Sequence, residues 1–170
     1  MKKLEYRGYD SAGIATISEN NINEVKCEGR VNELEKNVNQ INLSGTIGIG
    51  HVRWATHGKP STINAHPHSS DNVSVVHNGI IENSTILKKI LEKKGYKFKS
   101  QTDTEVIVHL VTDYLKKNNL KDTIIKVLKK LHGSFALGII FKDKPDLIIG
   151  ARRGSPLAVG YGCLLYTSDA

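Results

Sequence analysis

The stretch VSVVHNGIIENSTILKKILEKKG, residues 73–95, contains the change from strand to helix on which the fold class depends. Its first part, residues 73–77, is a short apolar run that predicts a β-strand. Residues 83–94 predict a helix, and Gly95 is suited to cap its C-terminal end. Between them, the pair Asn78-Gly79 is by itself typical of a hairpin turn, although it could also mark a strand end.

Upstream of this stretch, the pattern predicts mostly strands. Residues 12–18 and 22–27 are β-rich runs around the turn Glu19-Asn20-Asn21, which predicts a hairpin. Residues 31–41 repeat apolar side chains at helical intervals, and residues 1–5 resemble the last turn of a helix. A strand is predicted at 46–54, followed by a polar loop at 55–72 whose length is typical of a functional loop.

Downstream, helices come first and strands follow. Thr102 and Glu105 have the spacing of a capping box ahead of a helix predicted at 106–117, and a second helix is predicted at 122–131. Apolar strands are then expected at 135–141, 147–150 and 157–160. This order of strands, helices and strands favours an α+β fold with two packed sheets and helices outside, rather than a doubly wound parallel sheet.

Composition excludes several classes of protein. The chain has 170 residues, a net charge of +7 and 39% hydrophobic residues, which is typical of one globular domain with a sizeable core. It contains no apolar run of the ~20 residues that a membrane helix needs. Its lysines fall on the predicted outer faces of helices, so we expect no nucleic-acid partner and no membrane. The widely spaced Cys27 and Cys163, without an apolar leader, indicate a cytoplasmic protein.

Five of the seven histidines lie in one 27-residue window, at positions His51, His57, His66, His68 and His77. A zinc site needs three or four ligands on rigid spacings, and this window offers no Cys, no Glu and only Asp71 besides the imidazoles. We therefore predict no metal site and expect these side chains to satisfy hydrogen bonds in loops and strands.

Five motifs follow one another along the chain. Taken singly they are ordinary: Arg53-Trp54 could be a strand pair, and Asp103 could help to cap a helix. Taken in order, they closely resemble the N-terminal glutaminase domain of the glutamine–fructose-6-phosphate aminotransferases, isomerising enzymes also called glucosamine-6-phosphate synthases. The motifs are EYRGYDSAGIA at 5–15, HVRWATHG at 51–58, NAHPH at 64–68, VVHNGIIEN at 75–83 and TDTEVI at 102–107.

This resemblance implies a class II glutamine amidotransferase with the αββα sandwich of the N-terminal-nucleophile hydrolases. It also implies a glutamine pocket, in which Arg53 pairs with the α-carboxylate and Asp103 with the α-ammonium group of the substrate. Trp54, Thr56 and His57 would form the pocket wall.

The same resemblance implies the catalytic groups. The side-chain amide of Asn78 and the N–H of Gly79 would form the oxyanion hole, and Arg7 would support the site. In this family an N-terminal Cys attacks the glutamine amide. Neither Cys27 nor Cys163 stands at such a position. We therefore expect a partial domain at 1–162 that lacks the nucleophile, the first strand and the C-terminal strands, and a tail at 163–170 that departs from the family pattern.

The implied parent reaction transfers the amide nitrogen of L-glutamine to fructose 6-phosphate, giving glucosamine 6-phosphate and glutamate without a cofactor. Fructose 6-phosphate would bind only to isomerase domains outside this chain, and the parent enzyme would be a homodimer. Two alternatives stay open. The chain could belong to another class II amidotransferase, such as an amidophosphoribosyltransferase, or it could be a catalytically inactive amino-acid-binding module.

Overall fold

The computed structural model describes residues 1–41, 43–55 and 58–160, and its first sheet has three antiparallel strands. β1 (Ser11–Ser18) lies between β2 (Asn21–Glu28) and β3 (Ile47–Arg53). The predicted hairpin is confirmed: Ser18 pairs with Asn21, and the two turn residues between them have φ angles of 50° and 56°. Such positive φ angles match the twist of a two-residue hairpin turn.

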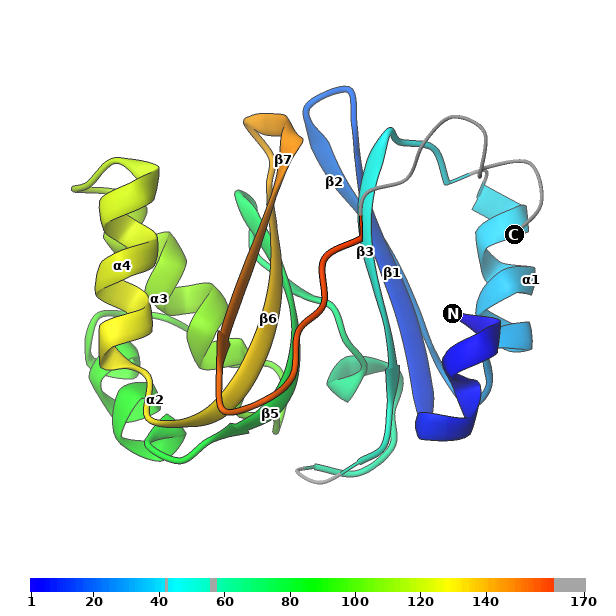
Figure 1. Ribbon diagram of the computed structural model, residues 1–170, viewed down its shortest axis with the longest axis horizontal. Coiled ribbons are helices and arrows are strands. Elements are labelled where there is room, and N and C mark those ends of the chain that lie inside the picture. Colours follow the sequence, from blue (N-terminus) through cyan, green and yellow to red (C-terminus); the bar gives the residue numbers. More distant parts are fainter. Residues whose placement is uncertain (42, 56–57, 161–170) are drawn as a thin grey trace.

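The second sheet has four antiparallel strands in the order β4-β5-β6-β7. They are β4 (His68–Ser69), β5 (Val73–Ile81), β6 (Gly133–Phe141) and β7 (Lys144–Arg153). β5 and β6 are distant in sequence yet pair along their whole length. The three helices that connect these two strands lie together on one side of the sheet (Figure 1).

Each sheet is covered by helices on its outer face, and the inner faces meet (Figure 1). α1 (Val31–Ile41) covers the first sheet, while α2 (Ser84–Lys93), α3 (Glu105–Leu115) and α4 (Leu120–Lys130) cover the second. Short 3₁₀ helices span Lys2–Arg7 and Thr62–Asn64. The predicted α+β layering is confirmed. Within the described ranges, no helix is long and apolar enough to cross a membrane.

Three apolar clusters hold these layers together. The largest lies between the second sheet and its helices, and includes Val75, Ile107 and Leu137. A smaller cluster joins α1 to the first sheet. The third consists of Ala15, Ile17, Ile49 and Ile140, and it connects the two sheets.

Several local predictions were wrong. Asn78-Gly79 is not a hairpin turn: both residues lie inside β5, opposite Ala136 and Phe135 of β6, because the strand continues to Ile81. No strand forms at 157–160. The helical turn predicted at 1–5 is a 3₁₀ helix that spans Lys2–Arg7.

The predicted capping box at the start of α3 does not form either. The carboxylate of Glu105 instead accepts hydrogen bonds from the backbone N–H groups of Lys99 and Ser100, at 2.8 and 2.7 Å. The hydroxyl of Thr102 faces His68 rather than a helix terminus. The polar residues here fasten the loop that precedes the helix, because Ser100 and Thr102 are buried and their polar groups need partners.

Candidate functional site

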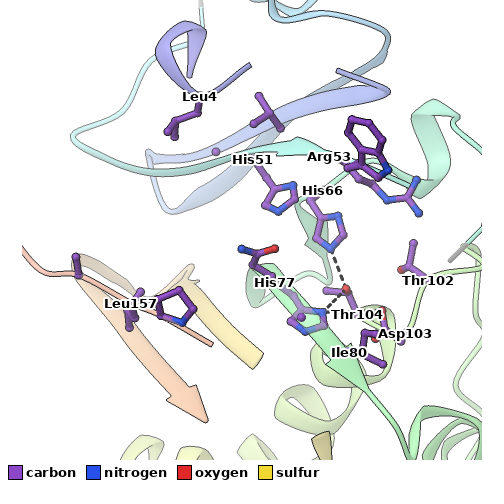
Figure 2. Close-up of a pocket in the computed structure, with 17 residues that line it drawn as sticks. Leu4, His51, Arg53, His66, His77, Ile80, Thr102, Asp103, Thr104 and Leu157 are labelled. Atoms are coloured by element: carbon purple, nitrogen blue, oxygen red, sulfur yellow. Dashed lines mark hydrogen bonds and ion pairs between the residues drawn. The ribbon is translucent and has the colours of Figure 1, made fainter. Parts of the chain in front are cut away.

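A cavity of about 820 Å³ lies between the two sheets (Figure 2). β3 forms one wall, β5 forms the opposite wall, and the segment before α3 closes one end. Residues of the chain after β7 line the other end. The lining residues are Leu4, Gly50, His51, Val52, Arg53, Trp54, His66, His77, Asn78, Gly79, Ile80, Thr102, Asp103, Thr104, Pro156, Leu157 and Ala158.

The structure brings five of the predicted site residues to this one cavity. They are Arg53, Trp54, Asn78, Gly79 and Asp103. The predictions for Thr56, His57 and the side chain of Arg7 lie outside the part of the chain that the structure describes.

Arg53 is the last residue of β3, and only 4% of its surface is exposed. Its guanidinium Nη2 donates to the carbonyl oxygen of Gly58, at 3.4 Å. Burial lowers the pKa of Arg53, and the negative charges of Asp10 and Asp103 counteract that effect. Because a guanidinium stays protonated in proteins, the wall of the cavity carries a fixed cation.

Asp103 provides the opposite charge. Its Oδ2 accepts a hydrogen bond from the backbone N–H of Ile81, at 2.7 Å, and its Oδ1 lies 3.9 Å from His77 Nδ1. Since the N-cap position of α3 is Thr104, Asp103 is tied to the end of β5 rather than used as the helix cap. A cation and a carboxylate on one cavity are the two charges that a zwitterionic amino acid needs.

The Asn78-Gly79 corner lies on the exposed part of β5 beside these charges. Gly79 has a φ of 136°, and a Cβ atom there would lie 2.1 Å from the carbonyl oxygen of Ser134. Only glycine fits this place, because the backbone of β6 passes too close for any side chain. The local sequence by itself is typical of a turn, since the strand that passes close to Gly79 is distant in sequence: its register partner is Phe135.

The histidines of the crowded window meet beside the cavity. Ring centroids of His51 and His66 are 4.5 Å apart, and those of His66 and His68 are 4.9 Å apart. Burial is the main cause that lowers their pKa values, to about 4 for His51, to about 3 for His68 and well below the ordinary value for His66. These imidazoles are therefore neutral at pH 7.

Threonine hydroxyls contact one nitrogen in each of three of these rings. His68 Nε2 contacts Thr102 Oγ1 at 2.9 Å, while His66 and His77 both contact Thr104 Oγ1. The prediction that these histidines take part in hydrogen bonds is confirmed for one nitrogen of each of these three rings. Among the described residues, no group of three or more His, Cys, Asp or Glu side chains is arranged to hold a metal ion.

Sequence reasoning missed the threonines. Thr102 and Thr104 line the cavity, as do His51, His66 and His77, none of which was predicted as a site residue. The available signal was the motif TDTEVI itself, in which two threonines flank the predicted carboxylate Asp103. Their use as partners of distant histidines depends on the tertiary fold.

Comparisons with known proteins show the family to which the chain belongs. Residues 52–168 match the family model described as "Glutamine amidotransferase domain", and the chain belongs to this family. It is similar to the glutamine–fructose-6-phosphate aminotransferase (isomerizing) of Clostridium acetobutylicum, with 56% identity over 162 residues, and to that of Bradyrhizobium diazoefficiens, with 53% identity over 163 residues. The resemblance inferred from the five motifs is confirmed.

These alignments cover 94% and 95% of this chain but only 26% and 27% of the relatives. The chain thus spans about a quarter of their length. Among solved structures, it is similar to the glutamine phosphoribosylpyrophosphate amidotransferase of B. subtilis complexed with ADP and GMP. That match has a TM-score of 0.69 and 33% identity, and it covers 82% of this chain and 30% of the other. The sandwich is therefore a fold shared with an amidotransferase.

Proposed function

We propose that this chain is the glutamine-binding part of a glutamine–fructose-6-phosphate aminotransferase. The longer protein would transfer the amide nitrogen of L-glutamine to fructose 6-phosphate, giving glucosamine 6-phosphate and glutamate. The identity of 53–56% with two such aminotransferases supports the reaction. The observation that carries the binding role is the presence of Arg53, Asp103 and the Asn78-Gly79 corner on one cavity.

In the proposed complex, the guanidinium of Arg53 binds the α-carboxylate of glutamine and the carboxylate of Asp103 binds its α-ammonium group. The substrate amide then extends toward the amide side chain of Asn78 and the backbone of Gly79, which stabilise the oxyanion of a tetrahedral intermediate. Trp54 lines the cavity. Thr56 and His57 would join it in binding glutamine, and Arg7 would have a supporting role, as the family resemblance implies.

We further propose that the chain binds glutamine without hydrolysing it, as a partial domain over 1–162. The reaction needs a thiol beside the oxyanion hole, and the described residues that line the cavity include no cysteine. Cys27 lies in β2, where burial raises the pKa of its thiol and disfavours the reactive thiolate. The isomerase chemistry, a homodimeric assembly and a cytoplasmic location belong to the proposed parent enzyme.

Calorimetric titration of the chain tests the binding role. L-Glutamine is expected to bind, whereas glutaramate, which lacks the α-ammonium group, is expected to bind far more weakly because Asp103 then has no partner. Ammonia release is expected to be zero. Equal heats for the two compounds, or no heat with L-glutamine, would contradict the proposed pocket. Steady ammonia release would contradict the proposal that the chain does not hydrolyse glutamine.

A second candidate is the glutaminase part of a phosphoribosyl-transferring amidotransferase, which the similarity to the B. subtilis structure favours. Both candidates use the same glutamine pocket, so they differ in the acceptor of the nitrogen. In the full-length protein, we expect fructose 6-phosphate and not phosphoribosyl pyrophosphate to accept nitrogen from glutamine. The opposite acceptor preference would establish the second candidate.

A further inference from the structure

The hydroxyl of Thr104 lies between two buried imidazole rings (Figure 2). Its Oγ1 atom is 2.8 Å from His66 Nε2 and 2.9 Å from His77 Nδ1. Thr104 is fully buried, and the two histidines are only 5% and 4% exposed. One hydroxyl therefore joins three segments: the loop that carries His66, strand β5 that carries His77, and the segment that begins α3.

This contact lies next to the residues of the proposed glutamine pocket. Thr104 directly follows Asp103, and His77 directly precedes Asn78. Asp103 is bound to the same strand a second time, through the N–H of Ile81. The segment before α3 is thus fastened to β5 on both sides of the Asn78-Gly79 corner.

The number of available protons restricts the state of the two rings. Thr104 has one hydroxyl proton, so it can donate to only one of the two nitrogens, and the other nitrogen must bring its own proton. Asp103 Oδ1 lies 3.9 Å from His77 Nδ1, and its negative charge favours a proton on that nitrogen. His77 then donates to Thr104, and Thr104 donates to His66 Nε2. Burial keeps the pKa of His66 well below its ordinary value, so the single ring proton of His66 is on Nδ1.

We propose that Thr104 is a positioning residue, whose hydroxyl holds His66 and His77 in complementary hydrogen-bonding states and so keeps Asn78 and Asp103 on the same cavity. The effect of Thr104 on ligand affinity rests on the proposed glutamine pocket. The effect of Thr104 on the two imidazole rings is independent of that pocket. Two separate measurements therefore test it.

The first measurement is imidazole ¹⁵N NMR of the unliganded chain at neutral pH, which identifies the protonated nitrogen of each ring. We expect Nδ1–H forms for His66 and His77 in the wild type and in Thr104→Ser. In Thr104→Val, whose side chain has a similar shape but no hydroxyl, we expect a mixture of tautomers for His66, while Asp103 keeps His77 protonated on Nδ1. An Nε2–H form of His77 in the wild type would overturn the proposal. An unchanged tautomer of His66 in Thr104→Val would also overturn it.

The second measurement is the affinity for L-glutamine by calorimetry. Thr104→Val is expected to weaken binding about 10-fold, because it removes the hydroxyl that both buried imidazole nitrogens contact, and Thr104→Ser is expected to restore wild-type affinity. Thr123→Val is the matched control, since Thr123 in α4 is equally buried and its hydroxyl has no hydrogen-bond partner among the described residues. Wild-type affinity in Thr104→Val would overturn the proposal.

The two measurements separate the proposals from each other. If the wild type binds no glutamine while its imidazoles show the expected states, the proposed function fails and the role of Thr104 in fixing the rings stands. If Thr104→Val does not fold, the wild type and Thr104→Ser still decide the question, because both must show His77 protonated on Nδ1.

Discussion

At the scale of single residues, the site is a set of charges held in place by burial. Arg53 is almost completely buried yet keeps its charge between Asp10 and Asp103. Asp103 is in turn held by a backbone N–H of β5. A cation and an anion that are held this firmly lose little freedom on binding, which favours recognition of a small zwitterion.

Replacing Arg53 tests this arrangement. Arg53→Ala is expected to weaken glutamine binding about 100-fold, because charge-assisted hydrogen bonds contribute about 1.5–3 kcal/mol. Arg53→Lys should recover only part of the affinity, since an ammonium group cannot bind a carboxylate in the same bidentate way. Calorimetry measures both effects, with Arg152→Ala in exposed β7 as the control. Unchanged affinity in Arg53→Ala would remove this residue from the pocket.

The buried histidines predict how stability depends on pH. In the folded chain the pKa values of His51 and His68 are lowered to about 4 and about 3, whereas the unfolded chain takes up these protons below pH ~6.5. Unfolded protein therefore binds more protons, and the free energy of unfolding falls as the pH decreases from about 6.5. Each such histidine contributes about 1.4 kcal/mol per pH unit within that window.

Urea unfolding at several pH values between 7.5 and 5 measures this slope. His68→Gln, whose amide can still contact Thr102, is expected to reduce the slope by about 1.4 kcal/mol per pH unit, the contribution of one such histidine. His132→Gln, at an exposed position, should leave it unchanged. A free energy of unfolding that does not vary between pH 7 and 5 would contradict the neutral state of these rings.

At the scale of the elements, the pairing of β5 with β6 shapes the oxyanion corner. Gly79 faces Phe135 in this register, and the space for a Cβ atom is filled by backbone. Such a close approach fixes the path of the strand exactly where Asn78 reaches the cavity. The corner is therefore a property of two paired strands rather than of a turn.

Gly79→Ala is expected to destabilise the fold by about 3 kcal/mol, since it combines an unfavourable φ with a backbone clash. Gly95→Ala is the matched comparison, because Gly95 also has a positive φ, of 90°, but nothing lies within 4 Å of the added atom. Its cost should be only about 1 kcal/mol. Chemical denaturation measures both, and equal losses would show that the passing strand is unimportant.

At the scale of the whole molecule, the cavity exists because two sheets with separate cores face each other. The apolar cluster that joins them is small, with Ile140 of β6 packed against Ala15, Ile17 and Ile49 of the first sheet. Arg53 is on one sheet, and Asn78 and Gly79 are on the other. Binding should therefore depend on how the sheets are held together.

Ile140→Ala is expected to cost about 2–5 kcal/mol, because it opens a void at this small contact, and to weaken glutamine binding as well. Ile125 in α4 is 41% exposed, so Ile125→Ala should change neither quantity appreciably. Denaturation followed by calorimetric titration checks both variants. If Ile140→Ala loses stability while keeping full affinity, the cavity does not depend on the contact between the sheets.

The sequence by itself determined the alternation of strands and helices, because apolar periodicity is a local property. It correctly predicted the hairpin of β1 and β2, the helix at Val31–Ile41 and the α+β layering. The ordered motifs also predicted the family and five residues that line one cavity. Motif residues can be recognised without knowing their spatial neighbours.

Only the tertiary structure decided what depends on segments far apart in the chain. Asn78-Gly79 has the local signature of a turn, yet pairing with β6 keeps it extended. Thr102 and Glu105 have the spacing of a capping box. In the fold, however, Thr102 contacts His68, and Glu105 accepts hydrogen bonds from the backbone at 99–100. A buried polar group must find a partner wherever the fold provides one, and that choice is made by packing rather than by sequence spacing.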